Sequence, residues 1–294
     1  MSEPDELYTL RAQFWLGHYQ MALDEAKSIM RRPMSADLKA EREELVARCQ
    51  IAMKDYDRVI SGDTSTPGLK ALALQAQYTT LAATGDTAQT LPVIQKLQSM
   101  LGDGVSPRVQ VTAAQVFLQA GMKKEALQCV HQGLTMEQSS LCIQIYLMID
   151  RLDLAQQALQ QLRRTDEDSM LTQLASVQVA LATGSSMAGD AVHTLNQISE
   201  QYGPSPMLLN LMACAQMQAG NYAEAEQKLS QARDEFGADD ADTLVNLIVA
   251  SQYQHKPIGD YVGTLKQKYP THFLSLGLDT VAGAFDREAI KYRA

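Results

Sequence analysis

Histidine and cysteine side chains are the best candidates in this chain for metal ligands or nucleophiles, and their spacing supports neither role. The 294 residues include five histidines and four cysteines, widely spaced and without a Cys-x-x-Cys pair. Cys129 and His131 lie two apart, which on a helix points their side chains about 200° apart. We therefore expect no metal site. We interpret the cysteines as buried free thiols in a reducing compartment: Cys49, Cys129, Cys142 and Cys214.

Phosphate-binding and calcium-binding loops are also missing from the sequence. The segment Gly102-Asp103-Gly104 lacks the further glycine and the preceding strand of a dinucleotide site. The acidic runs at 166–168 and 239–242 lack the glycine and glutamate spacing of a calcium loop. Neither a His-Glu-x-x-His helix nor a Gly-x-Ser-x-Gly turn occurs. We therefore expect a protein that is not an enzyme and that needs no cofactor.

The composition favours an all-helical protein without nucleic-acid or membrane-inserting character. Hydrophobic residues make up 46% of the chain, aromatic residues only 6%, and glycine and proline are few. The net charge is −9, and no basic stripe suited to nucleic acid is found. No apolar run is long enough to cross a membrane, and the acidic start does not resemble a secretory signal. We expect a cytoplasmic chain.

A short turn phrase recurs between helical segments. Gly17-His18-Tyr19-Gln20-Met21-Ala22 and Gly220-Asn221-Tyr222-Ala223-Glu224-Ala225 both read Gly-x-Tyr-x-x-Ala. Together with weaker copies of this phrase, the turn residues fall at 17, 54, 85, 121, 150, 184, 220 and 255. The successive spacings are 37, 31, 36, 29, 34, 36 and 35 residues, with a mean of 34. This period is typical of the tetratricopeptide repeat, which the chain resembles over nearly its whole length.

The repeat frame predicts an all-α, tetratricopeptide-repeat superhelical solenoid of about eight helix-turn-helix repeats. Small residues are expected where paired helices approach, and alanine stands there at 47, 114 and 213 before the turns and at 22, 126, 155 and 225 after them. We find no boundary and expect one domain over 1–294. The segment 273–294 falls outside the frame and is expected to form a C-terminal capping helix through Leu276, Val281, Phe285 and Ile290.

Two rows of residues mark the expected binding surface. The resemblance to tetratricopeptide proteins implies that the first helix of each repeat lines a concave face. Six residues before the turn residue, three successive repeats have Gln115, Gln144 and Gln178. Three residues before the turn residue, four successive repeats have Leu118, Leu147, Leu181 and Met217. These positions share a helix face, so they predict a groove that holds a partner peptide or helix. The alternative for the leucine row is that it belongs to the core of the repeats.

A second interpretation is a co-chaperone that clamps a C-terminal carboxylate. Such tetratricopeptide proteins use lysine, asparagine and arginine in the groove. Asn210 and Asn246 face the groove in this frame, but matching cations beside them are not found. The acidic chain also disfavours this alternative, a tetratricopeptide co-chaperone or adaptor that binds a peptide in its concave groove.

Several longer phrases resemble one family in a single order along the chain. They are 149–155 (Ile-Asp-Arg-Leu-Asp-Leu-Ala), 166–175, Leu208-Leu209-Asn210, 242–252, Lys256-Pro257 and Phe285-Asp286-Arg287. Together with the acidic start before a Gly-x-Tyr-Gln turn and a length near 300 residues, they resemble the epsilon subunits of coatomer, the COPI vesicle coat.

This resemblance implies a non-enzymatic coat subunit. Epsilon subunits bind the C-terminal domain of the alpha coatomer subunit within the heptameric coatomer, and the superhelix curls around part of that partner. The implied role is to stabilise alpha during Golgi-to-endoplasmic-reticulum and intra-Golgi vesicle transport. The implied location is cytoplasmic and peripheral on Golgi membranes and coated vesicles, with no direct membrane insertion.

Overall fold

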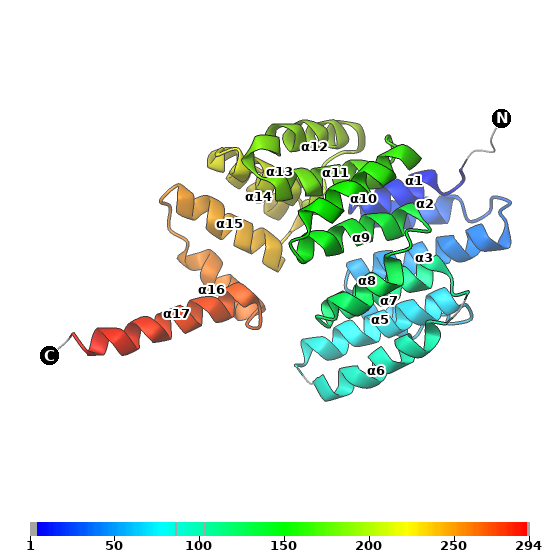
Figure 1. Cartoon of the computed structure of the whole chain (residues 1–294), viewed down its shortest axis with the longest axis horizontal. Helices are drawn as coiled ribbons and strands as arrows, with labels where there is room; N and C mark the ends of the chain where they lie inside the picture. The colour runs from blue at the N-terminus through cyan, green and yellow to red at the C-terminus, as the bar shows by residue number, and fades with distance from the viewer. Residues whose placement is uncertain (1–4, 86, 103, 293–294) are drawn as a thin grey trace. The chain divides into compact units, whose positions relative to one another are not determined.

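The computed structural model describes residues 5–85, 87–102 and 104–292, and within these ranges the regular structure is entirely helical. Figure 1 shows the helices in chain order. They are α1 (Tyr8–Trp15), α2 (Tyr19–Ser28), α3 (Ala36–Ala52), α4 (Tyr56–Ile60), α5 (Pro67–Ala83), α6 (Thr87–Met100), α7 (Pro107–Gln119), α8 (Lys123–Val130), α9 (Met136–Met148), α10 (Leu152–Thr165), α11 (Met170–Thr183), the 3-10 turn η1 (Ser185–Met187), α12 (Ala188–Tyr202), α13 (Pro206–Gln218), α14 (Tyr222–Phe236), α15 (Ala241–Tyr253), α16 (Gly259–Lys268) and α17 (Phe273–Ile290).

The predicted turn residues separate eight helix pairs, and the tetratricopeptide fold is confirmed. Each of the eight turn positions has a positive φ, the conformation that reverses the chain after a helix. Five are glycine. The other three adopt the left-handed region at a steric cost: Lys54 (φ 65°), Asp150 (φ 55°) and His255 (φ 59°).

A common hydrogen bond closes most of these turns. The backbone N–H of the residue after the turn residue donates to the carbonyl five residues earlier, as from Met122 to Phe117 at 2.8 Å and from Asn221 to Gln216 at 2.8 Å. This is the Schellman arrangement, which satisfies carbonyls left free at a helix end. The same bond joins Arg151 to Tyr146 at 2.9 Å, so the turn forms even where glycine is missing.

Five of the first helices, α3, α5, α9, α13 and α15, begin with a side-chain cap. Ser35, Thr66, Thr135 and Ser205 each accept a hydrogen bond from the backbone N–H three residues later, at 3.1–3.2 Å. Asp240 caps α15 in the same way at 3.1 Å. Such caps stabilise a helix by about 1 kcal/mol each. They explain why the loops between repeats are rich in serine and threonine.

The predicted contact points between paired helices are buried. Alanines at 22, 47, 114, 126, 155, 213 and 225 all lie in the core. Larger residues stand at the equivalent places of other repeats, including Leu10, Tyr78 and Ile143, and these are buried as well. A tyrosine and an alanine cannot hold two helices at the same separation, so the repeats are irregular.

The chain divides into two compact units, Met1–Ala182 and Thr183–Ala294. In the first unit, neighbouring first helices pack in series: α1 on α3, α3 on α5, α5 on α7 and α7 on α9. Phe117 belongs to a core cluster to which α5, α6, α7, α8 and α9 all contribute. The expectation of a single domain over 1–294 stays a prediction.

The second unit contains α12 to α17. Helix α13 packs against α12, α14 and α15, and α15 packs against α16. Helix α17 touches the unit mainly at its beginning, where Leu274 packs against the α15–α16 core and Ser275 is buried. The four expected capping residues are more than half exposed, so capping by these residues stays a prediction: Leu276 (54%), Val281 (67%), Phe285 (71%) and Ile290 (66%).

Candidate functional site

Five first helices of the first unit converge on one cavity of about 340 Å³. Every residue of its wall comes from α1, α3, α5, α7 or α9, so the cavity lies on the face that first helices share. Three of the predicted binding residues line it, namely Gln115, Leu118 and Gln144. The structure therefore brings together part of the glutamine row and one residue of the leucine row.

The amides of this wall are joined across neighbouring helices. The side chain of Gln75 on α5 donates to the side-chain oxygen of Gln115 on α7 at 3.2 Å. One helical turn later, the hydroxyl of Thr79 donates to the side-chain oxygen of Gln119 at 3.3 Å. Sequence reasoning missed Gln75, because counting back from each turn aligned Gln115 with Thr79. The available signal was the i, i+4 spacing of Gln75 and Thr79, which places both on one face.

The leucine and methionine row belongs in part to the core. Leu118 packs against the core around Phe117 while also lining the cavity. Leu147 packs against the α9–α10 core, and Met217 packs against the α13–α14 core. Leu181 is half-buried on α11. This row therefore serves packing at least as much as it serves an open surface.

Gln178 on α11 continues the row within the first unit. Its side-chain oxygen is buried and has no hydrogen-bond partner among the residues that the structure describes. A buried carbonyl oxygen without a donor costs about 1–3 kcal/mol, so this position favours an incoming donor.

Asn210 and Asn246, in the second unit, bond to each other. The amide of Asn246 donates to the side-chain oxygen of Asn210 at 3.0 Å. The amide of Asn210 donates to the Pro206 carbonyl at 2.9 Å and to the Thr243 hydroxyl at 2.8 Å. Both N–H groups of Asn210 are thus used, which leaves none for clamping a carboxylate.

Arg48 on α3 is the charged side chain of the amide-lined cavity. Its guanidinium lies 4.5 Å from the centre of the Phe14 ring and pairs with Glu137, which stands in the first turn of α9. Burial lowers the pKa of Arg48, but the charge of Glu137 and the hydrogen bond to it outweigh burial and raise the pKa above its ordinary value. The pair spans 89 residues of sequence and joins α3 to the first turn of α9.

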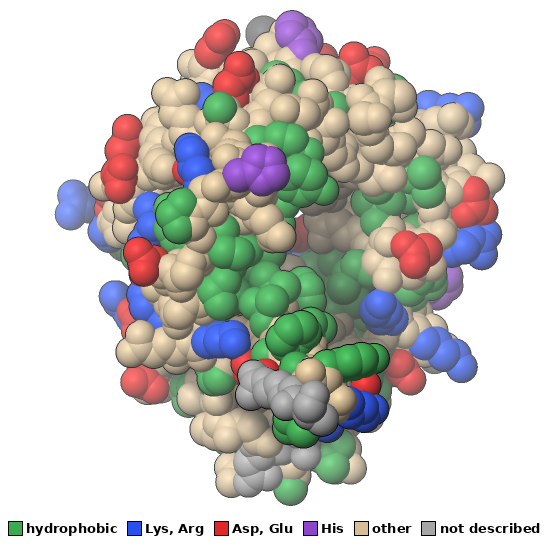
Figure 2. Space-filling view, turned by 90° about the vertical axis from the view of Figure 1, so that its left-hand side faces the viewer, with side chains coloured by type: hydrophobic (Ala, Val, Ile, Leu, Met, Phe, Trp, Pro, Cys, Tyr) green, Lys and Arg blue, Asp and Glu red, His purple; other side chains and the backbone are tan. Residues whose placement is uncertain are grey.

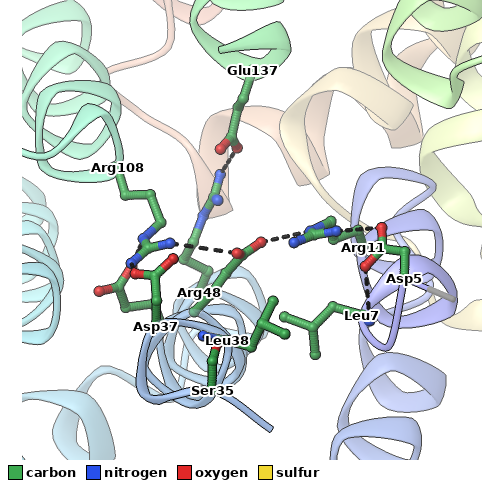
Figure 3. Close-up of polar contacts among 11 residues, drawn as sticks. Asp5, Leu7, Arg11, Ser35, Asp37, Leu38, Arg48, Arg108 and Glu137 are labelled. Atoms are coloured by element: carbon green, nitrogen blue, oxygen red, sulfur yellow. Dashed lines mark hydrogen bonds and ion pairs between the residues drawn. The ribbon is translucent and has the colours of Figure 1, made fainter. Parts of the chain in front are cut away.

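A second cavity, of about 380 Å³, lies beside the first and shares Arg48 with it. Figure 3 shows the ion pairs around it. Arg108 at the start of α7 reaches α3 at Asp37 (2.8 Å) and Glu44 (2.8 Å), and Arg11 reaches Glu41 at 2.6 Å. These pairs join α1 and α7 to α3 and so hold these first helices together.

Burial and ion pairing act in opposite directions on two of these carboxylates. The side chain of Glu44 is only 8% exposed, and burial raises its pKa although Arg108 lowers it. Asp37 is exposed, and the hydrogen bond from Arg108 holds its pKa below the ordinary range. Both carboxylates already pair with Arg108, so the charged groups around this second cavity are used in ion pairs within the chain.

Metal-ligand clusters and membrane-spanning helices were searched for among the described residues. Across residues 5–85, 87–102 and 104–292, no group of three or more His, Cys, Asp and Glu side chains could hold a metal ion. Over the same ranges, none of the helices combines the length and the apolar character that a membrane span requires.

Helix α17 exposes a row of apolar side chains. Figure 2 faces the C-terminal end of this helix, and hydrophobic side chains are exposed in that view. Phe273, Val281 and Phe285 are each about two thirds exposed or more. The sequence pattern identified these residues as apolar and helical, but it could not tell that the chain leaves them uncovered.

The chain matches the family model described as coatomer epsilon subunit over residues 3–293. It is 33% identical over 276 residues to coatomer subunit epsilon-1 of Oryza sativa subsp. japonica, covering 93% of each chain. It is also 33% identical over 292 residues to coatomer subunit epsilon-1 of Arabidopsis thaliana, covering 98% of this chain and 97% of that protein.

A solved structure is similar in fold alone. A chain in the crystal structure of the APC/C hetero-tetramer Cut9–Hcn1 superposes with a TM-score of 0.59 at 13% sequence identity. The match covers 94% of this chain and 55% of that one. The helical-repeat fold and the full-length sequence matches together indicate a structural, non-catalytic component of the COPI coat, and the chain belongs to the coatomer epsilon subunit family.

Proposed function

We propose that this chain binds the C-terminal domain of the alpha coatomer subunit through the inner face of its first helices and so stabilises alpha within the heptameric coat. Through that complex it supports Golgi-to-endoplasmic-reticulum and intra-Golgi vesicle transport. It would be cytoplasmic when free and peripheral on Golgi membranes and coated vesicles when recruited by the coat.

The amide-lined cavity of the first unit is the observation that carries this proposal. Gln75, Gln115 and Gln144 present amide groups beside the apolar side chains of Leu118 and Leu141. Apolar surface drives association, and amides bind main-chain or polar groups of the partner, so this combination suits a polypeptide. Gln178 continues the glutamine row on α11, and its side-chain oxygen has no donor among the described residues.

Charge placed on this face tests the proposal. Gln144→Glu combined with Gln178→Glu should weaken binding to the purified alpha C-terminal domain at least about tenfold, because a carboxylate must then be buried at the interface. Circular dichroism should report unchanged helicity. The single change Gln144→Glu should act in the same direction, and it leaves the buried α11 position intact.

A matched control uses two exposed glutamines of the second helix α10. Gln156→Glu with Gln160→Glu adds the same charge to a helix that does not line the cavity. Binding should be unchanged in this control. Equal weakening by both pairs of changes, or full binding by the inner-face variant, would contradict the assignment of the inner face.

A further inference from the structure

Arg48 has unused hydrogen-bonding capacity inside the cavity proposed to receive the partner. Its Nη2 donates to Glu137, the one acceptor that the described residues offer it. A guanidinium carries five N–H donors in a rigid fork, so the other donors have no protein acceptor there. The Arg48 side chain is only 14% exposed, which limits what water can supply.

The charge of the cavity wall is one-sided. Its other lining residues are glutamines and apolar side chains, so Arg48 gives the wall a single positive charge. Glu137, which balances this charge, lines the neighbouring cavity instead. A carboxylate entering from the amide side would therefore find a cation, amide donors and a partly desolvated site, where charge-assisted hydrogen bonds are strongest.

Building on the proposed function, we propose that Arg48 is a specificity residue: its guanidinium N–H groups donate to a carboxylate side chain of the partner, which competes with Glu137 for Arg48. The occupant is an aspartate or glutamate flanked by apolar residues, because Phe14, Ile51, Leu118 and Leu141 line the same cavity as Arg48. A side chain is favoured over a chain terminus, since the wall offers one cation rather than a cluster.

Two substitutions with opposite expected effects test this inference in the full-length chain. Glu137→Gln removes the competing carboxylate and should tighten binding to the alpha C-terminal domain by about three- to tenfold. Arg48→Gln removes the receiving cation and should weaken binding about tenfold or more. Arg48→Lys should fall between wild type and Arg48→Gln, because an ammonium keeps the charge but lacks the fork.

The salt dependence of the affinity gives a second readout. Wild type and Glu137→Gln should bind more weakly as salt rises, whereas Arg48→Gln should lose much of that dependence. Equal weakening by Glu137→Gln and Arg48→Gln would mean that the ion pair serves only to hold α3 and α9 together, and would overturn the inference. Because Glu137→Gln keeps Arg48, it decides the question even if Arg48→Gln unfolds the chain.

A change to the alpha domain tests whether the carboxylate belongs to a side chain or to the chain terminus. A flexible Gly-Ser extension after the last residue of the alpha domain moves the terminal carboxylate away and should leave binding unchanged. Loss of binding with this extension would identify a terminal carboxylate and overturn the side-chain assignment. Failure of the wild-type chain to bind would overturn the proposed function itself, whereas wild-type binding with unaltered Arg48→Gln affinity would overturn only this inference.

Discussion

The side-chain nitrogen of Gln75 on α5 lies 3.2 Å from the side-chain oxygen of Gln115 on α7 and donates a hydrogen bond to it. Gln75 is buried, so removing one partner leaves an unsatisfied amide. We expect Gln115→Leu alone, which leaves the buried Gln75 amide without its acceptor, to destabilise the fold by about 1–2 kcal/mol, and Gln75→Leu with Gln115→Leu to cost less than this single change. Thermal unfolding measures whether the double variant is more stable than the single variant. The double variant should still bind the partner more weakly, and undiminished binding would show that the amides serve only the fold.

The left-handed turn residues offer a stability test of the repeat frame. Lys54, Asp150 and His255 adopt positive φ without being glycine. Replacing each by glycine should stabilise the fold by about 0.5–1 kcal/mol, the steric cost less the added chain entropy. Gly121→Ala should instead destabilise by about 1–2 kcal/mol. At Gly121 (φ 75°) an added Cβ meets nothing within 4 Å, so the backbone conformation alone sets the effect. Stabilisation by Gly121→Ala would contradict the turn assignment.

Gly68 in the first turn of α5 lies against the buried carboxylate of Glu44. A Cβ at Gly68 would lie 1.9 Å from the Glu44 Oε1 atom, so Gly68→Ala must displace Glu44 from its place beside Arg108. We expect a loss of about 1–3 kcal/mol in the free energy of unfolding. Gly189→Ala in α12 is the matched control, because nothing lies within 4 Å of its Cβ and alanine favours the helix. An unchanged melting temperature for Gly68→Ala would show that Glu44 can move without cost.

The thiols should be protected in the folded chain. Burial raises the pKa of Cys49 to about 12, although the charge of Arg48 lowers it, and burial raises the pKa of Cys129 to about 11. At mildly alkaline pH the reactive thiolate at Cys49 is then about a thousandfold scarcer than at an ordinary thiol, and at Cys129 about a hundredfold. Alkylation followed by peptide mass spectrometry should modify Cys129 before Cys49. Reaction should rise as pH approaches these pKa values or when the chain unfolds, and rapid labelling of Cys49 at neutral pH would contradict its burial.

The repeat frame was accessible from the sequence because it depends on local rules. A residue that reverses the chain after a helix and an alanine where two helices touch leave a signal at fixed spacing. The prediction worked even at Asp150, where the turn lacks glycine. The Schellman hydrogen bond from Arg151 to Tyr146 is set by backbone geometry, and it forms there as it does after glycine.

The inner surface was less accessible because it depends on the sum of many small rotations between repeats. The row of Gln115 and Gln144 was found by counting, but the contact between Gln75 and Gln115 is displaced by one turn, since neighbouring first helices do not align at their ends. The pairing of Arg48 with Glu137 joins α3 to α9. No local sequence pattern predicts this contact, because it depends on how four successive repeats stack.

We propose that the inner face of this chain holds the alpha coatomer C-terminal domain. Isothermal titration calorimetry of the full-length chain with that purified domain, at low and high salt, measures this binding. We predict a one-to-one complex with a negative heat-capacity change, which persists at high salt because apolar burial supplies much of the affinity. Absence of a complex at either salt concentration, or binding of a partner through its C-terminal peptide alone, would contradict this mode of binding.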